Sequence, residues 1–166
     1  MADAVRILGI DPGSRVTGYG VVESDGSFTR YIGSGCIRIA EQPFDARLER
    51  IFIGVSGLID EFHPSHVAIE KVFVHRNADS ALKLGHARAA AICGTFGGDV
   101  ERFEYAARQI KQAVVGRGGA DKQQVEHMVK AILAINNPLA PDEADALAVA
   151  ICHAHSRPPR LGRLTG

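Results

Sequence analysis

Residues 5–22 read VRILGIDPGSRVTGYGVV, and this stretch decides how the fold begins. Val5 to Ile10 is a short, apolar, β-branched run, which is typical of a buried strand. Asp11-Pro12-Gly13 ends that run with a turn signal. Residues 17–22 predict a second strand that pairs back on the first as a hairpin.

Alternating strand and helix patterns fill the rest of the chain. Tyr31–Ile39 predicts a third strand, and apolar residues at helical spacing predict a helix over Phe44–Phe62. Val67–Ile69 is a short apolar run that ends at Glu70. The elements expected after it are a helix capped by Asn77 and running toward Gly97-Gly98, a strand over 100–105, and helices over about 107–115, 121–135 and 141–155. This order predicts an α/β fold with a mixed five-stranded sheet flanked by helices, as in ribonuclease H-like proteins.

Size and composition bound the architecture. The chain has 166 residues, of which 46% are hydrophobic, and we expect one domain over residues 1–156 followed by a basic, flexible tail over 157–166. We expect no signal peptide, and no membrane contact because no apolar run approaches about 18 residues. The three cysteines form no C-x-x-C pair, which argues against a disulfide scaffold or zinc site and predicts a reducing, cytoplasmic location.

Charge is unevenly distributed although the net charge is zero. Residues 1–70 hold 6 Lys/Arg and 10 Asp/Glu, whereas residues 71–130 hold 10 and 6. Residues 131–152 hold three acidic and no basic residues, and residues 153–166 hold three basic ones. Basic segments beside acidic ones suit a phosphate-binding face around a metal-binding cluster, although scattered solvated charges give the same counts.

Four carboxylates are expected to meet. Asp11 ends the first strand and Glu70 the fourth, so parallel pairing of those strands would place both at one sheet edge. Asp142 and Asp145 share a face of the last helix, whose N-terminus could dock at the same edge. Like charges this close require a compensating cation, and hard oxygen ligands select Mg²⁺ or Mn²⁺. Two ions about 4 Å apart would clamp a scissile phosphate.

Each of these groups also has a purely structural interpretation. Asp11 before Pro-Gly is a common turn residue, and acids in the first turn of a helix favourably meet the helix dipole. Glu70 is harder to explain in this way, because an apolar strand leads straight into it. The seven histidines form no credible ligand set, and we expect His153 and His155 to be surface or helix-end residues.

Four segments resemble the RuvC family of Holliday junction resolvases, in one register over about residues 5–155: ILGIDPGSRVTGYG (7–20), AIEKVF (68–73), NADSALKLG (77–85) and DEADALA (142–148). The resemblance implies an endonuclease that resolves four-way junctions in recombination and DNA repair by paired, symmetric, Mg²⁺-dependent hydrolysis, leaving 5′-phosphate and 3′-hydroxyl ends. It implies a homodimer, the RuvA–RuvB branch-migration complex as a partner, and four catalytic, metal-binding residues: Asp11, Glu70, Asp142 and Asp145. Glu143 stands where relatives often have alanine, and we expect it to face away from the metals.

The resemblance also implies DNA contacts at Phe73, Arg76, Lys111, Arg117 and Lys122. Phe73 resembles an aromatic residue that wedges against bases at the crossover, where stacking contributes about 1–3 kcal/mol, although a core phenylalanine is the alternative. Lys111 and Lys122 flank the glycine-rich loop 116–119 and resemble lysines that hold phosphate near the cut. Solvated surface cations are the alternative for all four basic residues.

The homodimer is expected to use the helix over Ala78–Phe96. This stretch is rich in small and apolar residues, and its second half is apolar nearly all round. One side could pack on its own sheet and the other on a second copy, with burial inside one subunit as the alternative. Resolving a four-way junction needs two nicks on symmetry-related strands, which favours a two-fold dimer of chains that each carry one site.

Two other functions stay open. An actin-like or sugar-kinase-like phosphotransferase also has a phosphate loop after a strand with Asp, Gly and a hairpin. Those folds close two lobes over ATP, and 166 residues supply one. A junction-binding protein that does not cleave is the non-enzymatic alternative, and the presence of all four carboxylates argues against it.

Overall fold

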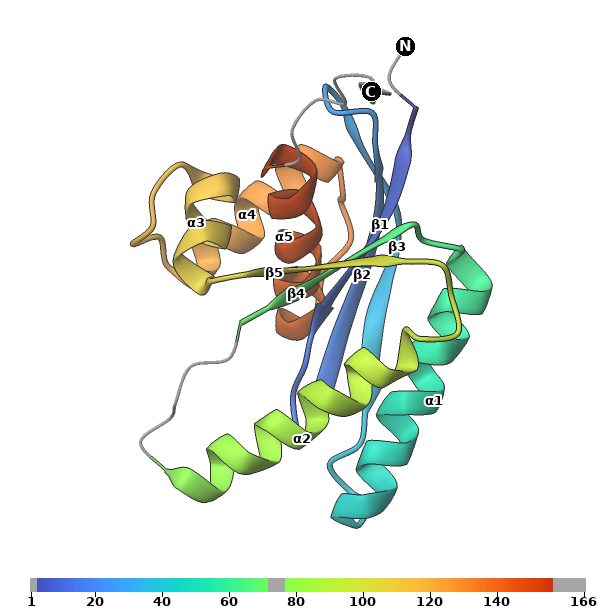
Figure 1. Cartoon of the computed structure of the whole chain (residues 1–166). Coiled ribbons are helices and arrows are strands. Elements are labelled where there is room, and N and C mark those ends of the chain that lie inside the picture. Colours follow the sequence, from blue (N-terminus) through green and yellow to red (C-terminus); the bar gives the residue numbers. More distant parts are fainter. Residues whose placement is uncertain (1–2, 72–76, 157–166) are drawn as a thin grey trace, which may run out of the picture.

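The computed structural model describes residues 3–71 and 77–156 (Figure 1). Its centre is a five-stranded sheet in the order β3-β2-β1-β4-β5. The strands are β1 (Val5–Asp11), β2 (Val16–Ser24), β3 (Thr29–Arg38), β4 (His66–Glu70) and β5 (Glu101–Tyr105). The first three pair antiparallel, as the hairpin signal predicted, whereas β4 pairs parallel with both β1 and β5. The predicted mixed five-stranded sheet is therefore confirmed.

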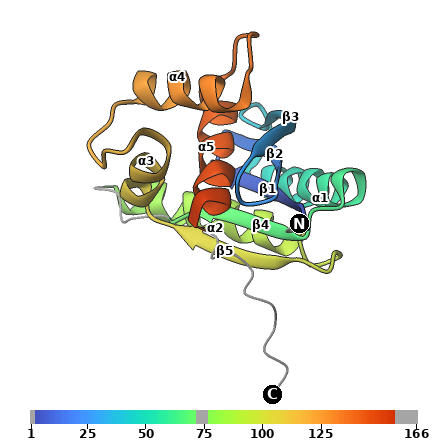
Figure 2. The ribbon, with the colours of Figure 1, turned by 90° about the horizontal axis from the view of Figure 1, so that it is seen from above.

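Helices cover both faces of the sheet (Figures 1 and 2). The bounds are α1 (Phe44–Phe62), α2 (Ala78–Gly94), α3 (Ala107–Val115), α4 (Lys122–Leu133) and α5 (Pro141–Ser156). Apolar side chains of α1 and α2 form one core with the sheet, and those of α3, α4 and α5 form a second core on the opposite face. Asn77 caps α2 as predicted, because its side chain accepts from the backbone N–H groups of Asp79 and Ser80. Two helices end earlier than expected, α2 at Gly94 and α4 at Leu133.

Helix α5 is the most deeply buried helix of the second core. Apart from Asp145, every residue from Ala144 to Ala154 is buried. Glycines on the facing strands allow this close approach, since a Cβ at Gly9 would collide with the carbonyl oxygen of Ala146 and one at Gly18 with that of Asp142. The sheet thereby fixes where the first turns of α5 lie.

His153 departs from the expected surface position. Its side chain is only 2% exposed, its Nδ1 lies 2.6 Å from the Tyr105 hydroxyl, and its Nε2 lies 2.9 Å from Nδ1 of His66. The expectation was wrong because the last turn of α5 still packs over β4 and β5, where the Phe103 ring lies against the imidazole. His155, two residues on, is exposed as expected.

Cys36, Cys93 and Cys152 are all free thiols. Within residues 3–71 and 77–156, none of the helices combines the length and the hydropathy needed to cross a bilayer. The tail 157–166 lies outside the described residues.

Candidate active site

The four carboxylates singled out from the sequence lie together. Asp11 is the last residue of β1 and Glu70 the last of β4, and these strands are parallel neighbours, with Ile10 opposite Ile69. The first two turns of α5 bring Asp142 and Asp145 to the same edge. All four line one cleft of about 440 Å³, together with Pro12, Ala107, Ile110, Lys111, Lys122, Val125 and Ala148. The convergence expected from strand ends and helix spacing is present in the fold.

Charge repulsion and burial make it unfavourable for all four carboxyl groups of this cluster to be ionised. Burial, together with the negative charges of Asp145, Glu70 and Asp142, raises the pKa of Asp11 from 3.8 to about 8. Burial, followed by the charge of Asp145, raises the pKa of Glu70 as well. Burial also raises the pKa of Asp145, against the lowering effect of Lys122. Near neutral pH this site therefore favours a bound proton or a bound cation over four bare carboxylates.

Lysine side chains already place positive charge at the cluster. The Lys122 ammonium lies 3.4 Å from Oδ2 of Asp145, and this carboxylate is the main cause of the raised Lys122 pKa. Lys111 lines the same cleft and lowers the pKa of both Glu70 and Asp145. The sequence had suggested only phosphate contacts for these lysines, whereas in the structure they also balance the carboxylates.

The donor set fits a divalent cation. Four carboxylates supply the oxygen ligands that Mg²⁺ and Mn²⁺ prefer, and the Lys122 ammonium lies where extra positive charge relieves their repulsion. No group of three or more His, Cys, Asp or Glu side chains in residues 3–71 and 77–156 is arranged as a ready-made metal site. Binding would therefore have to draw the carboxylates of this cleft closer together.

The other expected DNA contacts have different outcomes. Arg117 is exposed in the loop after α3 and does not line the carboxylate cleft. Phe73 and Arg76 lie outside the described residues.

A second groove adjoins the carboxylates at Asp142. It measures about 850 Å³ and runs between the turn that follows β1 and the start of α2, with Gly13, Ser14, Arg15, Val16, Asn77, Ser80, Leu84 and Asp142 as its lining. The sequence reasoning assigned no role to Arg15. Its position four residues after Asp11, in a turn, was the available signal for a cation near the site.

Comparisons with known proteins show which family the chain resembles. A family model described as crossover junction endodeoxyribonuclease RuvC matches residues 7–153. The protein of that name from Pseudoalteromonas translucida is 62% identical over 150 residues, which cover 90% of this chain and 86% of that relative. The one from Aliivibrio fischeri is 53% identical over 163 residues, which cover 96% of this chain and 94% of that relative.

Solved structures show the same fold. Thermus thermophilus RuvC in complex with a Holliday junction substrate superposes with a TM-score of 0.85 at 34% identity, over 91% of this chain and 93% of that one. A yeast mitochondrial Holliday junction resolvase shares the fold at 14% identity, with a TM-score of 0.63 over 91% of this chain and 79% of that one. The family model spans residues 7–153, and the sequence relatives and the Thermus thermophilus structure each cover 90% or more of this chain. The chain therefore belongs to the RuvC family of crossover junction endodeoxyribonucleases.

Proposed function

We propose that this protein resolves Holliday junctions by hydrolysing one phosphodiester bond at each of two carboxylate sites. The proposed catalytic residues are Asp11, Glu70, Asp142 and Asp145. The observation that carries the proposal is the meeting of these four half-buried, mutually repelling carboxylates with two lysines in one cleft. Membership of the family adds the substrate class, since its Thermus thermophilus member has been seen bound to a Holliday junction. Membership of this nuclease family also excludes the alternative function as a phosphotransferase.

The carboxylates would hold Mg²⁺, with Mn²⁺ as a substitute and two ions per site as the expected number. When bound, the metal supplies a Lewis acid for the scissile phosphate and lowers the pKa of its water. Asp11 and Glu70 are held by the sheet, and Asp142 and Asp145 by a buried helix, so the ligands start from fixed positions. In the hydrolysis, a water oxygen bonds to phosphorus and the P–O3′ bond breaks, which leaves 5′-phosphate and 3′-hydroxyl ends.

Basic side chains around the cleft would hold the DNA. Lys111 and Lys122 can bind the phosphate next to the cut, because both line the carboxylate cleft. Arg15 and the start of α2 line the adjoining groove, which would take the backbone on the other side of Asp142. Phe73, Arg76 and Arg117 remain proposed contacts by family resemblance.

Residues 1–156 would act as a single nuclease domain within a homodimer. On the outside of α2, Leu82 is 64% exposed, whereas Ala87 and Ala91 pack against the protein's own core. This helix can therefore meet a second copy while it stays attached to its own sheet. The family also suggests the RuvA–RuvB complex as a partner. The free thiols of Cys36, Cys93 and Cys152 agree with work in the cytoplasm.

A cleavage assay tests the activity. A synthetic four-way junction and a linear duplex of the same sequence are incubated with the protein in Mg²⁺, Mn²⁺ or EDTA. We expect paired nicks in the junction, none in the duplex, and no cleavage in EDTA. Tight junction binding without cleavage in either metal would favour the non-cleaving junction-binding protein instead.

Mixed dimers test the two-site geometry. Dimers that combine one unmodified chain with one Asp145→Asn chain keep one complete carboxylate cluster. We expect them to bind junctions and to release mostly singly nicked product. A protein that sediments as a monomer on the junction while it still makes paired cuts would refute the dimer.

A further inference from the structure

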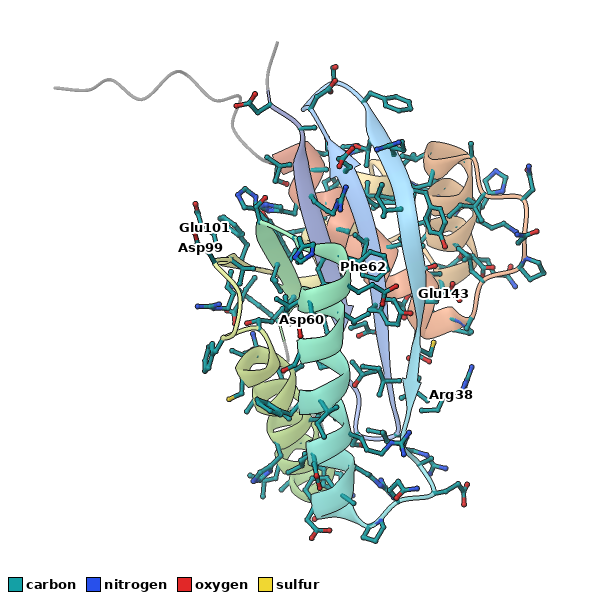
Figure 3. All side chains as sticks on the ribbon, turned by 90° about the vertical axis from the view of Figure 1, so that its right-hand side faces the viewer. Arg38, Asp60, Phe62, Asp99, Glu101 and Glu143 are labelled. Atoms are coloured by element: carbon teal, nitrogen blue, oxygen red, sulfur yellow. The ribbon has the colours of Figure 1, made fainter. Side chains whose placement is uncertain are left out.

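Glu143 lies between two proposed metal ligands in sequence, yet its carboxylate points away from the cleft. Oε1 accepts a hydrogen bond from Oγ of Ser34 on β3 at 2.5 Å, and Oε2 accepts from the backbone N–H of Ala140 at 3.2 Å. The side chain is half-buried and lies beside β3, as Figure 3 shows. One carboxylate oxygen therefore binds β3 and the other binds the backbone just before α5, and Glu143 does not line the cleft.

The contact with β3 continues through a second hydroxyl. The Tyr31 hydroxyl lies 2.9 Å from Oγ of Ser34. Since Ser34 gives its one hydrogen to Glu143, Tyr31 must donate to Ser34, and the three groups form a directional chain. The start of α5 is thus attached to β3 through the Glu143 carboxylate and the Ser34 hydroxyl.

The bond to Ala140 closes the first turn of α5. The carbonyl oxygen of Ala140 accepts the N–H of Ala144, so Ala140 occupies the N-cap position, and its side chain cannot cap. Glu143, three residues on, reaches back to the N–H of Ala140, which is half of a capping box. Without this bond and the one to Ser34, the turn that carries Asp142 would fray more readily.

We propose that Glu143 is a positioning residue, and that the clamp formed by Ser34, Glu143 and Ala140 sets how closely Asp142 and Asp145 approach Asp11 and Glu70 for metal binding. The inference rests on the metal centre proposed above. The four carboxylates repel one another, and Asp11 and Glu70 are fixed because they lie on strands inside the sheet. The other two carboxylates therefore need contacts that hold them in place. The first turn of α5 is the part of the site that repulsion would displace.

A charge effect is the competing explanation. Glu143 adds a negative charge near the site, which by itself would attract a cation. Glu143→Gln separates the two ideas. The glutamine carbonyl can accept from Ala140 while its amide donates to Ser34, whose hydroxyl then turns to Tyr31, so both links survive without the charge. Positioning predicts that Glu143→Gln behaves like the unmodified protein, whereas a charge effect predicts that it behaves like Glu143→Ala.

Metal affinity in the absence of DNA is the direct measurement, made by titration calorimetry with Mg²⁺ and with Mn²⁺ on the full chain. We expect Glu143→Ala to weaken metal binding about 10-fold or more, the scale seen when groups that orient ligands are removed. Ser34→Ala should weaken it about 3-fold or more, and Glu143→Gln should stay within about twofold of the unmodified protein. Junction binding without metal should not change in any variant.

Ser56→Ala is the matched control. Its Oγ donates to the carbonyl oxygen of Gly94 at 3.2 Å, so this variant also loses one serine hydrogen bond, but between α1 and α2. We expect Ser56→Ala to keep full metal affinity even if it lowers the melting temperature as much as Ser34→Ala does. In cleavage assays, Glu143→Ala should lower kcat and leave the KM for the junction unchanged.

The possible failures are distinguishable. If the unmodified protein binds neither metal, the metal centre is refuted and the clamp falls with it. If it binds metal and Glu143→Ala binds equally well, only the positioning role is refuted. Equal losses in Glu143→Gln and Glu143→Ala would replace positioning by the charge effect.

Discussion

Asp11→Asn should stabilise the metal-free protein in a pH-dependent way. The pKa of Asp11 is about 8 in the fold and 3.8 as its ordinary value, so between these pH values the folded chain keeps a proton that the unfolded chain releases. The free energy of unfolding that this group contributes is fully present below about pH 4 and is lost as pH rises toward about 8. The asparagine side chain cannot ionise, so the variant lacks this loss.

The magnitude follows from linkage. Each pH unit between the two pKa values costs the fold at most about 1.4 kcal/mol, which gives a limit of about 4 kcal/mol between pH 5 and pH 8. Glu70 and Asp145 also have raised pKa values, chiefly because they are buried, so their pH dependence is expected in both proteins. We therefore expect Asp11→Asn to gain about 2–4 kcal/mol over the unmodified protein on going from pH 5 to pH 8.

Urea unfolding in EDTA at the two pH values measures this double difference. Asp60→Asn is the control, because it removes one negative charge from the exposed face of α1 (Figure 3) and should leave the pH dependence unchanged. Adding Mg²⁺ at the higher pH should stabilise the unmodified protein and not Asp11→Asn, since only a binding-competent fold gains from the ligand. If the unmodified protein and Asp11→Asn had parallel pH profiles of stability, the pKa of Asp11 would not be raised in the fold.

Four further substitutions have expected outcomes. Asp142→Asn should abolish junction cleavage in Mg²⁺ and spare binding in gel-shift assays, so cleavage at near-normal rate would remove this residue from the metal site. His153→Ala should lower the free energy of unfolding in urea by about 2–4 kcal/mol, because a buried imidazole with two hydrogen bonds is lost and a cavity opens, and an unchanged midpoint would contradict this. Leu82→Glu should shift sedimentation toward monomer with little change in melting temperature, since the side chain is 64% exposed. Lys122→Ala should reduce the salt dependence of junction binding by about one counterion, and an unchanged salt slope would show that Lys122 does not bind phosphate.

The fold was largely predictable because its signals are local. The spacing of apolar residues predicted a helix over 44–62, and the structure has the same bounds. The hairpin at Asp11-Pro12-Gly13 likewise needs only its own residues and a turn. Parallel pairing of β1 with β4 was a condition in the argument for the site, and it holds. The early end of α2 was missed, because Phe96 continues the apolar pattern although the helix ends before it.

The site was predictable only in its carboxylates, since each of them follows a recognisable local element. Contacts between distant segments could not be found in the same way: Ser34 and Glu143 are 109 residues apart, and His66 and His153 are 87 apart. The burial of His153 did have a usable signal, because residues 146–152 are apolar all round and a helix of that kind is buried on every side. The ion pair of Lys122 with Asp145 had none, as it depends on how α4 packs beside α5.

Two opposing demands meet at the start of α5. Repulsion among four half-buried carboxylates pushes Asp142 and Asp145 away from the sheet in the metal-free protein, whereas metal binding needs them close. The start of α5 is held by contacts that do not use the four cleft carboxylates. Gly18 lies against the backbone of Asp142, and Glu143 is hydrogen-bonded to Ser34 and Ala140. These contacts resist displacement in the direction that the charges favour. The raised pKa of Asp11 and the contacts of Glu143 are therefore two parts of one arrangement, in which contacts outside the cleft limit how far repulsion can move the carboxylates apart.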